Sequence, residues 1–165
     1  LEKQIRHSSN TDFLTGLYNR RCFYQYIHNN RGGRTVSLMY IDLDRFKEVN
    51  DTYGHKVGDA VLVHTADVLR RLFRDDFVAR LGGDEFLVVR LGKCSMDQME
   101  QEAEAFLKEM RTAFLAAEQT VSLSASVGIA QSSDSMVDID ALLQRSDQAL
   151  YQAKKAGRSR YCVYR

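Results

Sequence analysis

Two adjacent carboxylates follow two glycines at a tight turn of the chain. The stretch ARLGGDEFLVV, residues 79–89, places Asp84 and Glu85 directly after Gly82 and Gly83. The apolar residues on either side have the pattern of two strands, so the turn is expected to close a β-hairpin. Taken alone, such a turn is as typical of an ordinary hairpin as of a functional site.

A third carboxylate ends an apolar strand earlier in the chain. The stretch TVSLMYIDLD, residues 35–44, alternates so that one apolar face ends at Asp42, and Asp44 comes two residues later. An isolated Asp-x-Asp after a strand is commonly a solvated turn. If the hairpin pairs beside this strand, however, Asp42 reaches the same sheet edge as the acids of the turn.

Carboxylates clustered at one sheet edge are costly unless a cation neutralises them. Their oxygen atoms suit a hard ion, so Asp42, Asp84 and Glu85 point to Mg²⁺ or Mn²⁺. No histidine lies close enough in sequence to Asp42 or Asp84 for a zinc spacing. Because a carboxylate-held Mg²⁺ normally keeps positions for water and substrate phosphates, the acids predict a metal site for a phosphorylated substrate.

Two segments of the chain are suited to bind phosphate. The stretch RFKEVND, residues 45–51, is expected to begin a short helix whose free N–H groups and dipole favour an anion, with Lys47 adding a charge. Lys154, Lys155 and Arg158 lie at the end of the last predicted helix. Both sets also have a structural interpretation, since lysine is commonly a solvated surface residue and basic side chains suit a helix C-terminus.

The periodicity of apolar residues predicts an α+β fold. Helical spacing alternates with strand-like runs around a central hairpin, which indicates a mostly antiparallel central sheet flanked by helices. The apolar stripe from Met96 to Phe114 is expected to face the core. The predicted helices are a short one over residues 19–30 and longer ones over residues 56–73, 95–114 and 138–157, and the predicted strands are residues 35–44, 77–81, 86–91, 120–131 and 159–165.

The composition is that of one globular domain. The chain has 165 residues, of which 44% are hydrophobic and 27% are charged, and its formal net charge is +1. So small a net charge argues against a nucleic-acid-binding module. Cys22, Cys94 and Cys162 lack a disulfide or zinc spacing and are expected to be reduced thiols in a cytoplasmic protein.

The sequence shows neither a membrane span nor a secretion signal. The longest apolar runs are too short to cross a bilayer, and the first residues are too polar for a signal peptide. We therefore do not expect this domain to insert into a membrane, although its parent protein could be anchored in one. Residues 1–9 are expected to be the end of a longer linker helix, followed by the domain itself over residues 10–165.

Several ordered motifs together resemble the GGDEF domain family of bacterial diguanylate cyclases. The resemblance covers residues 8–165, and a whole domain of motifs in order is far more specific than one GGDEF string. It implies a polymerase-palm-like, nucleotidyl-cyclase-like fold, preceded in the parent protein by an N-terminal sensory region. The motifs are TDFLTGLYNRR, DLDRFKEVNDTYGHKVGD, ARLGGDEF, SASVGIA and DQALYQAKKAGRSR.

The resemblance implies that the domain joins two GTP molecules into cyclic di-GMP and releases two pyrophosphates, with Mg²⁺ or Mn²⁺ as cofactor. The 3′-hydroxyl of one GTP would attack the α-phosphorus of the other in line. Each domain offers one nucleotide site, so the productive unit would be a two-fold homodimer. The resemblance leaves open whether Asp84, Glu85 or a metal-bound water removes the hydroxyl proton.

The family motifs assign catalytic roles to the acids. Asp42, the carbonyl of Leu43 and Asp84 correspond to metal ligands, and Glu85 is a second essential acid beside them. The glycines of the signature, Gly82 and Gly83, would let the α-phosphate and the metal approach the backbone.

Asn50 and Asp59 match the family's guanine-reading pair. A carboxylate can accept hydrogen bonds from both N1–H and the exocyclic amine of guanine, whereas adenine has no proton on N1. We expect Asp59 to be buried, so that a bound ATP would leave it unpaired. His55, in the YGH triplet, is expected near the base or ribose, either as a structural hydrogen-bonding residue or in direct contact.

The resemblance also assigns residues to the triphosphate. Phe46 and Lys47 would offer backbone N–H groups and a positive charge, and Lys154 and Arg158 would clamp the outer phosphates. Lys155 keeps its interpretation as a solvated surface residue.

One departure from the family pattern concerns a product-binding inhibitory site. Many members carry Arg-x-x-Asp before the signature, where the arginine grips cyclic di-GMP. Here Arg74 and Asp76 are separated by one residue, and the usual arginine position holds Phe73. A one-residue shift displaces the arginine side chain, so that it can no longer bind the product through two parallel hydrogen bonds. We therefore predict weak or absent product inhibition. The alternative is that the loop adjusts its conformation and Arg74 still reaches cyclic di-GMP.

Two other functions are compatible with the resemblance. A catalytically silent GTP-binding signalling module would share the fold and lack some catalytic position, whereas every such position is intact here. A dimerisation or scaffold domain would have no reason to keep acids at the turn.

Overall fold

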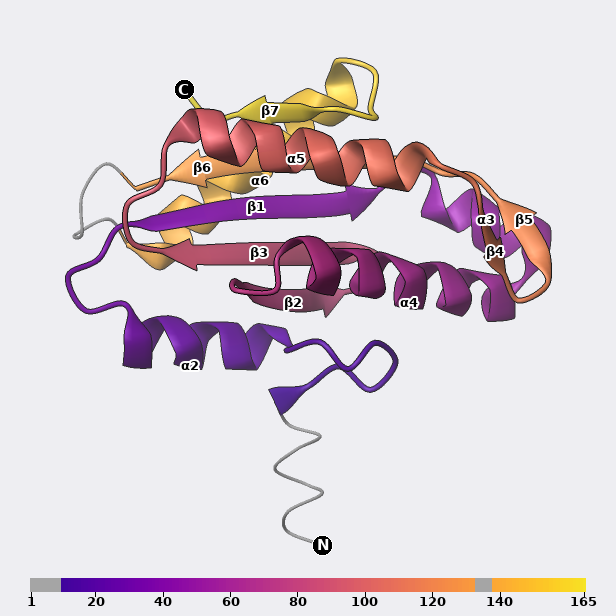
Figure 1. The fold of residues 1–165 in the computed structure, drawn as a ribbon, viewed down its shortest axis with the longest axis horizontal. Helices are drawn as coiled ribbons and strands as arrows, with labels where there is room; N and C mark the ends of the chain where they lie inside the picture. Colours follow the sequence, from indigo (N-terminus) through magenta and orange to yellow (C-terminus); the bar gives the residue numbers. More distant parts are fainter. Residues whose placement is uncertain (1–9, 133–137) are drawn as a thin grey trace, which may run out of the picture.

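The computed structural model describes residues 10–132 and 138–165, so the linker helix expected over residues 1–9 lies outside the described part. A five-stranded sheet in the order β2-β3-β1-β6-β7 has helices on both faces, and β4 pairs with β5 in a separate ribbon (Figure 1). The strands are β1 Val36–Leu43, β2 Phe77–Gly82, β3 Glu85–Leu91, β4 Phe114–Ala116, β5 Gln119–Val121, β6 Ala125–Gln131 and β7 Tyr161–Val163. The helices are α2 Arg20–Asn30, α3 Phe46–Tyr53, α4 His55–Leu72, α5 Met96–Arg111 and α6 Ile139–Lys155.

The sheet is mostly antiparallel, as predicted. β1 pairs antiparallel with β3 on one side and with β6 on the other, and β2 pairs antiparallel with β3. Among the strands of the described residues, β6 and β7 are the one neighbouring pair that is hydrogen-bonded in parallel. All eight residues of β1 are buried, because helices cover this central strand on both faces.

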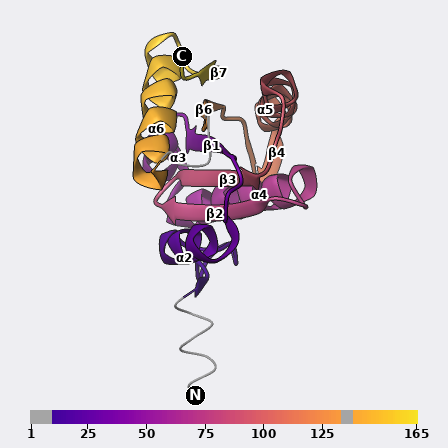
Figure 2. The same cartoon turned by 90° about the vertical axis from the view of Figure 1, so that its left-hand side faces the viewer.

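Alternate residues of β1 enter two separate cores. One core lies under α2 and α6, and the other lies under α4 and α5; Figure 2 shows α6 and α5 on opposite sides of the sheet. This division follows from the two-residue period of a strand whose two faces are both covered. The first core takes Val36, Leu38 and Tyr40, and the second takes Met39, Ile41 and Leu43.

Two predicted elements were wrong in extent. The helix expected over residues 95–114 ends at Arg111, so Phe114 leaves the helical stripe and begins β4. The strand expected over residues 120–131 is two strands, because β5 turns back to pair with β4 while β6 pairs with β1.

All three cysteines lie within the described residues. Cys22, Cys94 and Cys162 are free, as expected. Among residues 10–132 and 138–165, no helix combines the length and apolar character that crossing a bilayer requires.

Candidate active site

Strand pairing brings the predicted acids together at one sheet edge. Asp42 lies directly opposite Glu85 in the register of β1 and β3. The N–H of Leu43 donates to the carbonyl of Asp84 at 3.3 Å. Asp42 is 8% exposed, whereas Asp84 and Glu85 are half-buried. The end of β1 and the hairpin turn therefore hold three carboxylates beside one another.

The glycines of the turn leave room next to these acids. Gly82 and Gly83 have φ angles of 148° and 51°, which side chains rarely adopt. A Cβ atom built on either glycine would meet no atom within 4 Å. The turn therefore has open space at both glycines.

The acids carry charge that the protein only partly compensates. Burial, followed by the proximity and negative charge of Asp42, raises the pKa of Asp84 to about 7. Asp42 Oδ1 is buried and has no hydrogen-bond partner among the described residues. A buried orphan oxygen beside a crowded carboxylate is the environment that a bound cation would relieve.

Lys154 supplies one positive charge to this site. Its ammonium group, at the end of α6, pairs with Asp42 Oδ2. Lys154, which the family motifs assign to the outer phosphates, is therefore paired with an acid of β1 in this structure. Arg158 lies on the loop that follows α6 and is exposed.

The donor set fits a hard divalent ion that takes part of its coordination from backbone and substrate. Asp42 and Asp84 offer carboxylate oxygens, and the carbonyl of Leu43 belongs to the same strand end. Within the two described ranges, no three His, Cys, Asp or Glu side chains form a cluster that could hold a metal by themselves.

Tyr40 is a site residue that the sequence reasoning missed. Its hydroxyl donates to Glu85 Oε2 at 3.3 Å, and its ring is 7% exposed. Burial, followed by the negative charge of Glu85, raises the pKa of Tyr40 to about 12, so the hydroxyl stays a donor at neutral pH. The available signal was its position two residues before Asp42, on the same face of the strand.

The guanine-reading pair lies on two consecutive helices, α3 and α4. Asn50 comes from α3 and Asp59 from α4, and a Cβ atom on Gly58 would lie 1.8 Å from Asn50 Oδ1. Gly58 therefore makes room for the Asn50 side chain, a role that the sequence reasoning also missed. The expectation that Asp59 is buried is wrong, because its side chain projects to solvent from the first turns of α4. His55 is the first residue of α4 and is exposed.

The N-terminus of α3 is open to an anion. Arg45 precedes the helix in the left-handed conformation, with φ 56°, and no side chain of the described residues caps the first turn. Phe46 is half-buried and Lys47 is exposed at this end. The backbone N–H groups of both residues thus point out of an uncapped helix end, which suits phosphate.

The first described loop is tied to the signature turn, a link that the sequence reasoning did not find. Arg80 donates from Nε to the carbonyl of Gly83 at 2.9 Å and from Nη1 to Asp12 Oδ1 at 2.9 Å. Asp12 Oδ2 accepts from the N–H and hydroxyl of Thr15 at 2.8 and 2.7 Å. The TDFLTG stretch therefore braces the turn that carries the acids.

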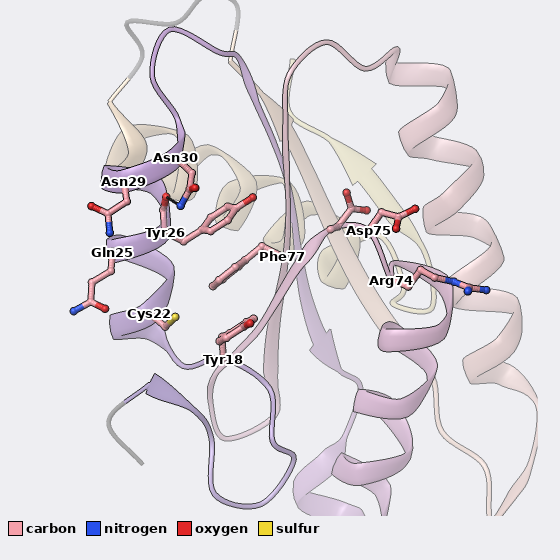
Figure 3. Close-up of a pocket in the computed structure, with 10 residues that line it drawn as sticks. Tyr18, Cys22, Gln25, Tyr26, Asn29, Asn30, Arg74, Asp75 and Phe77 are labelled. Atoms are coloured by element: carbon pink, nitrogen blue, oxygen red, sulfur yellow. Dashed lines mark hydrogen bonds between the residues drawn. The ribbon is translucent and has the colours of Figure 1, made fainter. Parts of the chain in front are cut away.

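The shortened inhibitory motif lies on the turn between α4 and β2. Phe73 is 2% exposed in the core, so its side chain does not reach the surface. Asp76 accepts two hydrogen bonds from Arg90, at 2.9 and 2.6 Å. Arg74 is exposed and, together with the stacked rings of Tyr18 and Phe77, lines a cavity of about 400 Å³ (Figure 3).

The sequence resembles curated proteins of which it covers only a part. It is 38% identical over 167 residues to "Cyclic di-GMP phosphodiesterase PdeR" of Escherichia coli (strain K12), with 99% of this chain and 25% of that protein covered. It is 37% identical over 167 residues to "Diguanylate cyclase DosC" of the same organism, with 96% of this chain and 36% of that protein covered. The chain thus spans about a quarter to a third of the length of these relatives.

The fold resembles solved GGDEF domains. The structure of the coiled coil and GGDEF domain of DgcB from Caulobacter crescentus, in complex with c-di-GMP, matches with a TM-score of 0.88 and 28% identity over 98% of this chain and 89% of that chain. The GGDEF domain of PA1120 (TpbB or YfiN) from Pseudomonas aeruginosa matches with a TM-score of 0.81 and 35% identity over 94% of both chains. A family model described as "Diguanylate cyclase, GGDEF domain" covers residues 9–160. Because that model matches nearly the whole chain and the folds agree, the chain belongs to the GGDEF domain family of diguanylate cyclases.

Proposed function

We propose that this domain condenses two GTP molecules into cyclic di-GMP and two pyrophosphates in a metal-dependent reaction. One observation carries the proposal: the register of β1 and β3 sets Asp42 opposite Glu85 and beside Asp84, and a buried oxygen of Asp42 has no hydrogen-bond partner among the residues that the structure describes. Two comparisons support it, since the relative DosC is named a diguanylate cyclase and the similar DgcB structure contains c-di-GMP.

In the proposed reaction, Asp42, the carbonyl of Leu43 and Asp84 hold Mg²⁺ or Mn²⁺. When bound, the ion lowers the pKa of the attacking 3′-hydroxyl and neutralises charge on the phosphoryl oxygens. Glu85 acts as the second acid at this edge, and the hydrogen bond from Tyr40 fixes its orientation. The open backbone of the signature turn admits the α-phosphate next to these acids.

The remaining site residues select and orient GTP. Asn50 and Asp59 hydrogen-bond the guanine edge, and the carboxylate of Asp59 accepts from N1–H and the exocyclic amine. Since Asp59 is exposed, discrimination against ATP comes from these charge-assisted hydrogen bonds more than from burial. His55 lies at the start of the same helix, near the base or ribose.

The triphosphate is held at two places in this proposal. The uncapped N-terminus of α3 offers the N–H groups of Phe46 and Lys47, with the Lys47 side chain adding charge. Lys154 and Arg158, from the other end of the sequence, contribute charge to the outer phosphates.

The productive unit is a two-fold homodimer. Each domain presents one nucleotide site, and formation of two phosphodiester bonds needs two GTP molecules facing each other. We propose that an N-terminal sensory region of the parent protein controls this encounter and that the domain works in the cytoplasm.

A silent GTP-binding module is the second candidate, because one relative is named a cyclic di-GMP phosphodiesterase. Incubation of the domain with GTP and Mg²⁺, followed by chromatography, separates the candidates. An active cyclase yields cyclic di-GMP and two equivalents of pyrophosphate. A silent module binds GTP without converting it at high protein concentration, and a scaffold domain does not bind GTP.

A further inference from the structure

Asp44 is a buried carboxylate that the proposed chemistry does not use. It is 5% exposed and follows β1 directly. Its Oδ2 accepts from the hydroxyl of Ser124 at 2.5 Å and from the N–H of Ser159 at 3.0 Å, and its Oδ1 accepts from the hydroxyl of Ser126 at 2.7 Å. The contact to Ser159 joins the end of β1 to the loop between α6 and β7, residues 156–160, which we call the α6–β7 loop.

The α6–β7 loop has a backbone that must be held from outside. Arg158 and Ser159 are consecutive non-glycine residues in the left-handed region, with φ angles of 64° and 51°. This conformation is unfavourable for residues other than glycine and persists where the surroundings fix it. The N–H of Arg158 donates to the carbonyl of Ala153 at 3.0 Å, which ties it only to its own helix end.

Arg111, at the end of α5, is a second anchor for this loop. Its Nη2 donates to the carbonyl of Ser159 at 2.7 Å, and its Nε donates to the Ser159 hydroxyl at 2.9 Å. Its Nη1 is engaged by Glu104 at 3.0 Å. Asp44 and Arg111 therefore satisfy the N–H, the carbonyl and the hydroxyl of the same left-handed residue.

The end of β1 positions both basic residues of the proposed phosphate clamp. Asp42 pairs with Lys154 in the last turn of α6, and Asp44, two residues later, binds the backbone next to Arg158. The two aspartates of the DLD triplet therefore have different roles. Asp42 lies in the acidic site, and Asp44 binds the backbone of the α6–β7 loop.

We propose that Asp44 and Arg111 are positioning residues that hold the α6–β7 loop so that Arg158 faces the outer phosphates of GTP. The inference rests on the proposed function for the identity of the ligand. It requires that the loss of either anchor weakens binding of the outer phosphates and leaves recognition of the base and the first phosphate unchanged. A merely structural role would lower stability and affect all nucleotides alike.

The test compares two probes by competition titration with Mg²⁺: 3′-deoxy-GTP, which lacks the attacking hydroxyl, and GMP, which lacks the outer phosphates. Arg111→Ala and Asp44→Asn are each expected to weaken 3′-deoxy-GTP binding by about tenfold and to leave GMP binding unchanged. Neither change should weaken 3′-deoxy-GTP further in an Arg158→Ala background, because the anchors act through that residue. Arg71→Ala, which breaks another exposed arginine pair to α5, with Glu109, is the matched control.

The outcomes separate this inference from the proposed function. An unchanged ratio of 3′-deoxy-GTP to GMP affinity in Arg111→Ala overturns the inference, even if Asp44→Asn fails to fold. The inference is also overturned if the losses of 3′-deoxy-GTP affinity caused by Arg111→Ala and by Arg158→Ala add fully in the double variant. If the domain makes no cyclic di-GMP but the ratio of 3′-deoxy-GTP to GMP affinity changes as expected, the cyclase proposal is refuted and the inference about the loop stands. A wild-type domain that binds 3′-deoxy-GTP no better than GMP refutes the inference, whatever its activity.

Discussion

Asp84 is the acid whose surroundings most disfavour a negative charge, since burial and Asp42 raise its pKa to about 7. Asp84→Asn is expected to lower cyclic di-GMP formation by about 100-fold or more, because an amide cannot replace an anionic metal ligand. The fold should persist, because the half-exposed side chain is not part of either core. Chromatography of the products and a thermal denaturation curve measure the two effects.

Asp67→Asn is the matched control for this substitution. Asp67 is an exposed carboxylate on α4, and it pairs with Arg70 away from the acidic edge. Its loss should leave product formation at the wild-type rate. Turnover near the wild-type rate in Asp84→Asn would contradict the assignment of Asp84 as a metal ligand.

Some site residues could be read from the sequence and others could not. The meeting of Asp42 with the acids of the turn was predictable, because the alternation of β1 and a hairpin beside it leave few registers. Asp44 and Tyr40 were not assigned roles, because their hydrogen bonds join residues 80 and 45 positions apart. The exposure of Asp59 depends on which face of α4 the neighbouring elements leave uncovered, and apolar spacing alone does not show this.

Two glycines lie where elements approach each other closely, and substitution by alanine is expected to affect GTP binding at one and stability at the other. In Gly58→Ala the new Cβ would lie 1.8 Å from Asn50 Oδ1, so the Asn50 side chain must move away. We expect a folded protein whose GTP affinity falls about tenfold, as for a lost base contact. In Gly128→Ala the Cβ would lie 2.1 Å from the Ser146 carbonyl oxygen of α6, a backbone atom, which should cost about 1–3 kcal/mol of stability.

Thermal denaturation and GTP titration of both variants test this contrast. The pair serves as its own control, because each substitution adds one methyl group at a buried glycine. Wild-type GTP affinity in folded Gly58→Ala would remove Asn50 from the base site. An unchanged melting temperature for Gly128→Ala would show that α6 is not held as closely to β6 as described.

His64 makes the contact between α4 and the β4–β5 ribbon sensitive to acid. Its ring stacks on Phe114 with centroids 3.7 Å apart, and its Nε2 is buried with no hydrogen-bond partner among the described residues. Burial lowers the pKa of His64 below its ordinary value of 6.5, although Asp67 and Glu109 oppose this shift. The folded state therefore disfavours the proton, and stability is lost as the pH falls through the unfolded value of 6.5.

His64→Phe should preserve the stack and remove the titrating group. We expect a smaller drop in melting temperature between about pH 7.5 and about pH 5.5 than in the wild-type domain. His28→Gln, at an exposed histidine of α2, is the control and should leave the drop unchanged. An identical acid sensitivity in wild type and His64→Phe would contradict this explanation.

At the level of elements, the sequence predicted the order of strands and long helices, including the hairpin that carries the acids. It did not predict the break in residues 120–131, because both halves have strand-like patterns and only their partners differ. It also carried the predicted helix from residue 95 through Phe114, whose apolar side chain continues the helical spacing but instead packs on His64 of α4.

The whole molecule is expected to bind its product weakly away from the active site. Phe73 is buried at the usual arginine position, and Asp76 is already engaged by Arg90. We expect no submicromolar binding of cyclic di-GMP to an Asp59→Ala domain, in which the substrate site is weakened. Submicromolar binding in calorimetry that disappears on Arg74→Ala would show that the loop adjusts and that the inhibitory site survives.

Assembly of two domains around two GTP molecules is the claim on which the proposed function depends most. The most direct measurement is the initial rate of cyclic di-GMP formation from GTP and Mg²⁺ over a range of domain concentrations. For a domain that dimerises weakly, the rate should rise with about the second power of concentration, because two nucleotide sites must meet for each product. Bound GTP that yields no cyclic di-GMP at any concentration would contradict the claim.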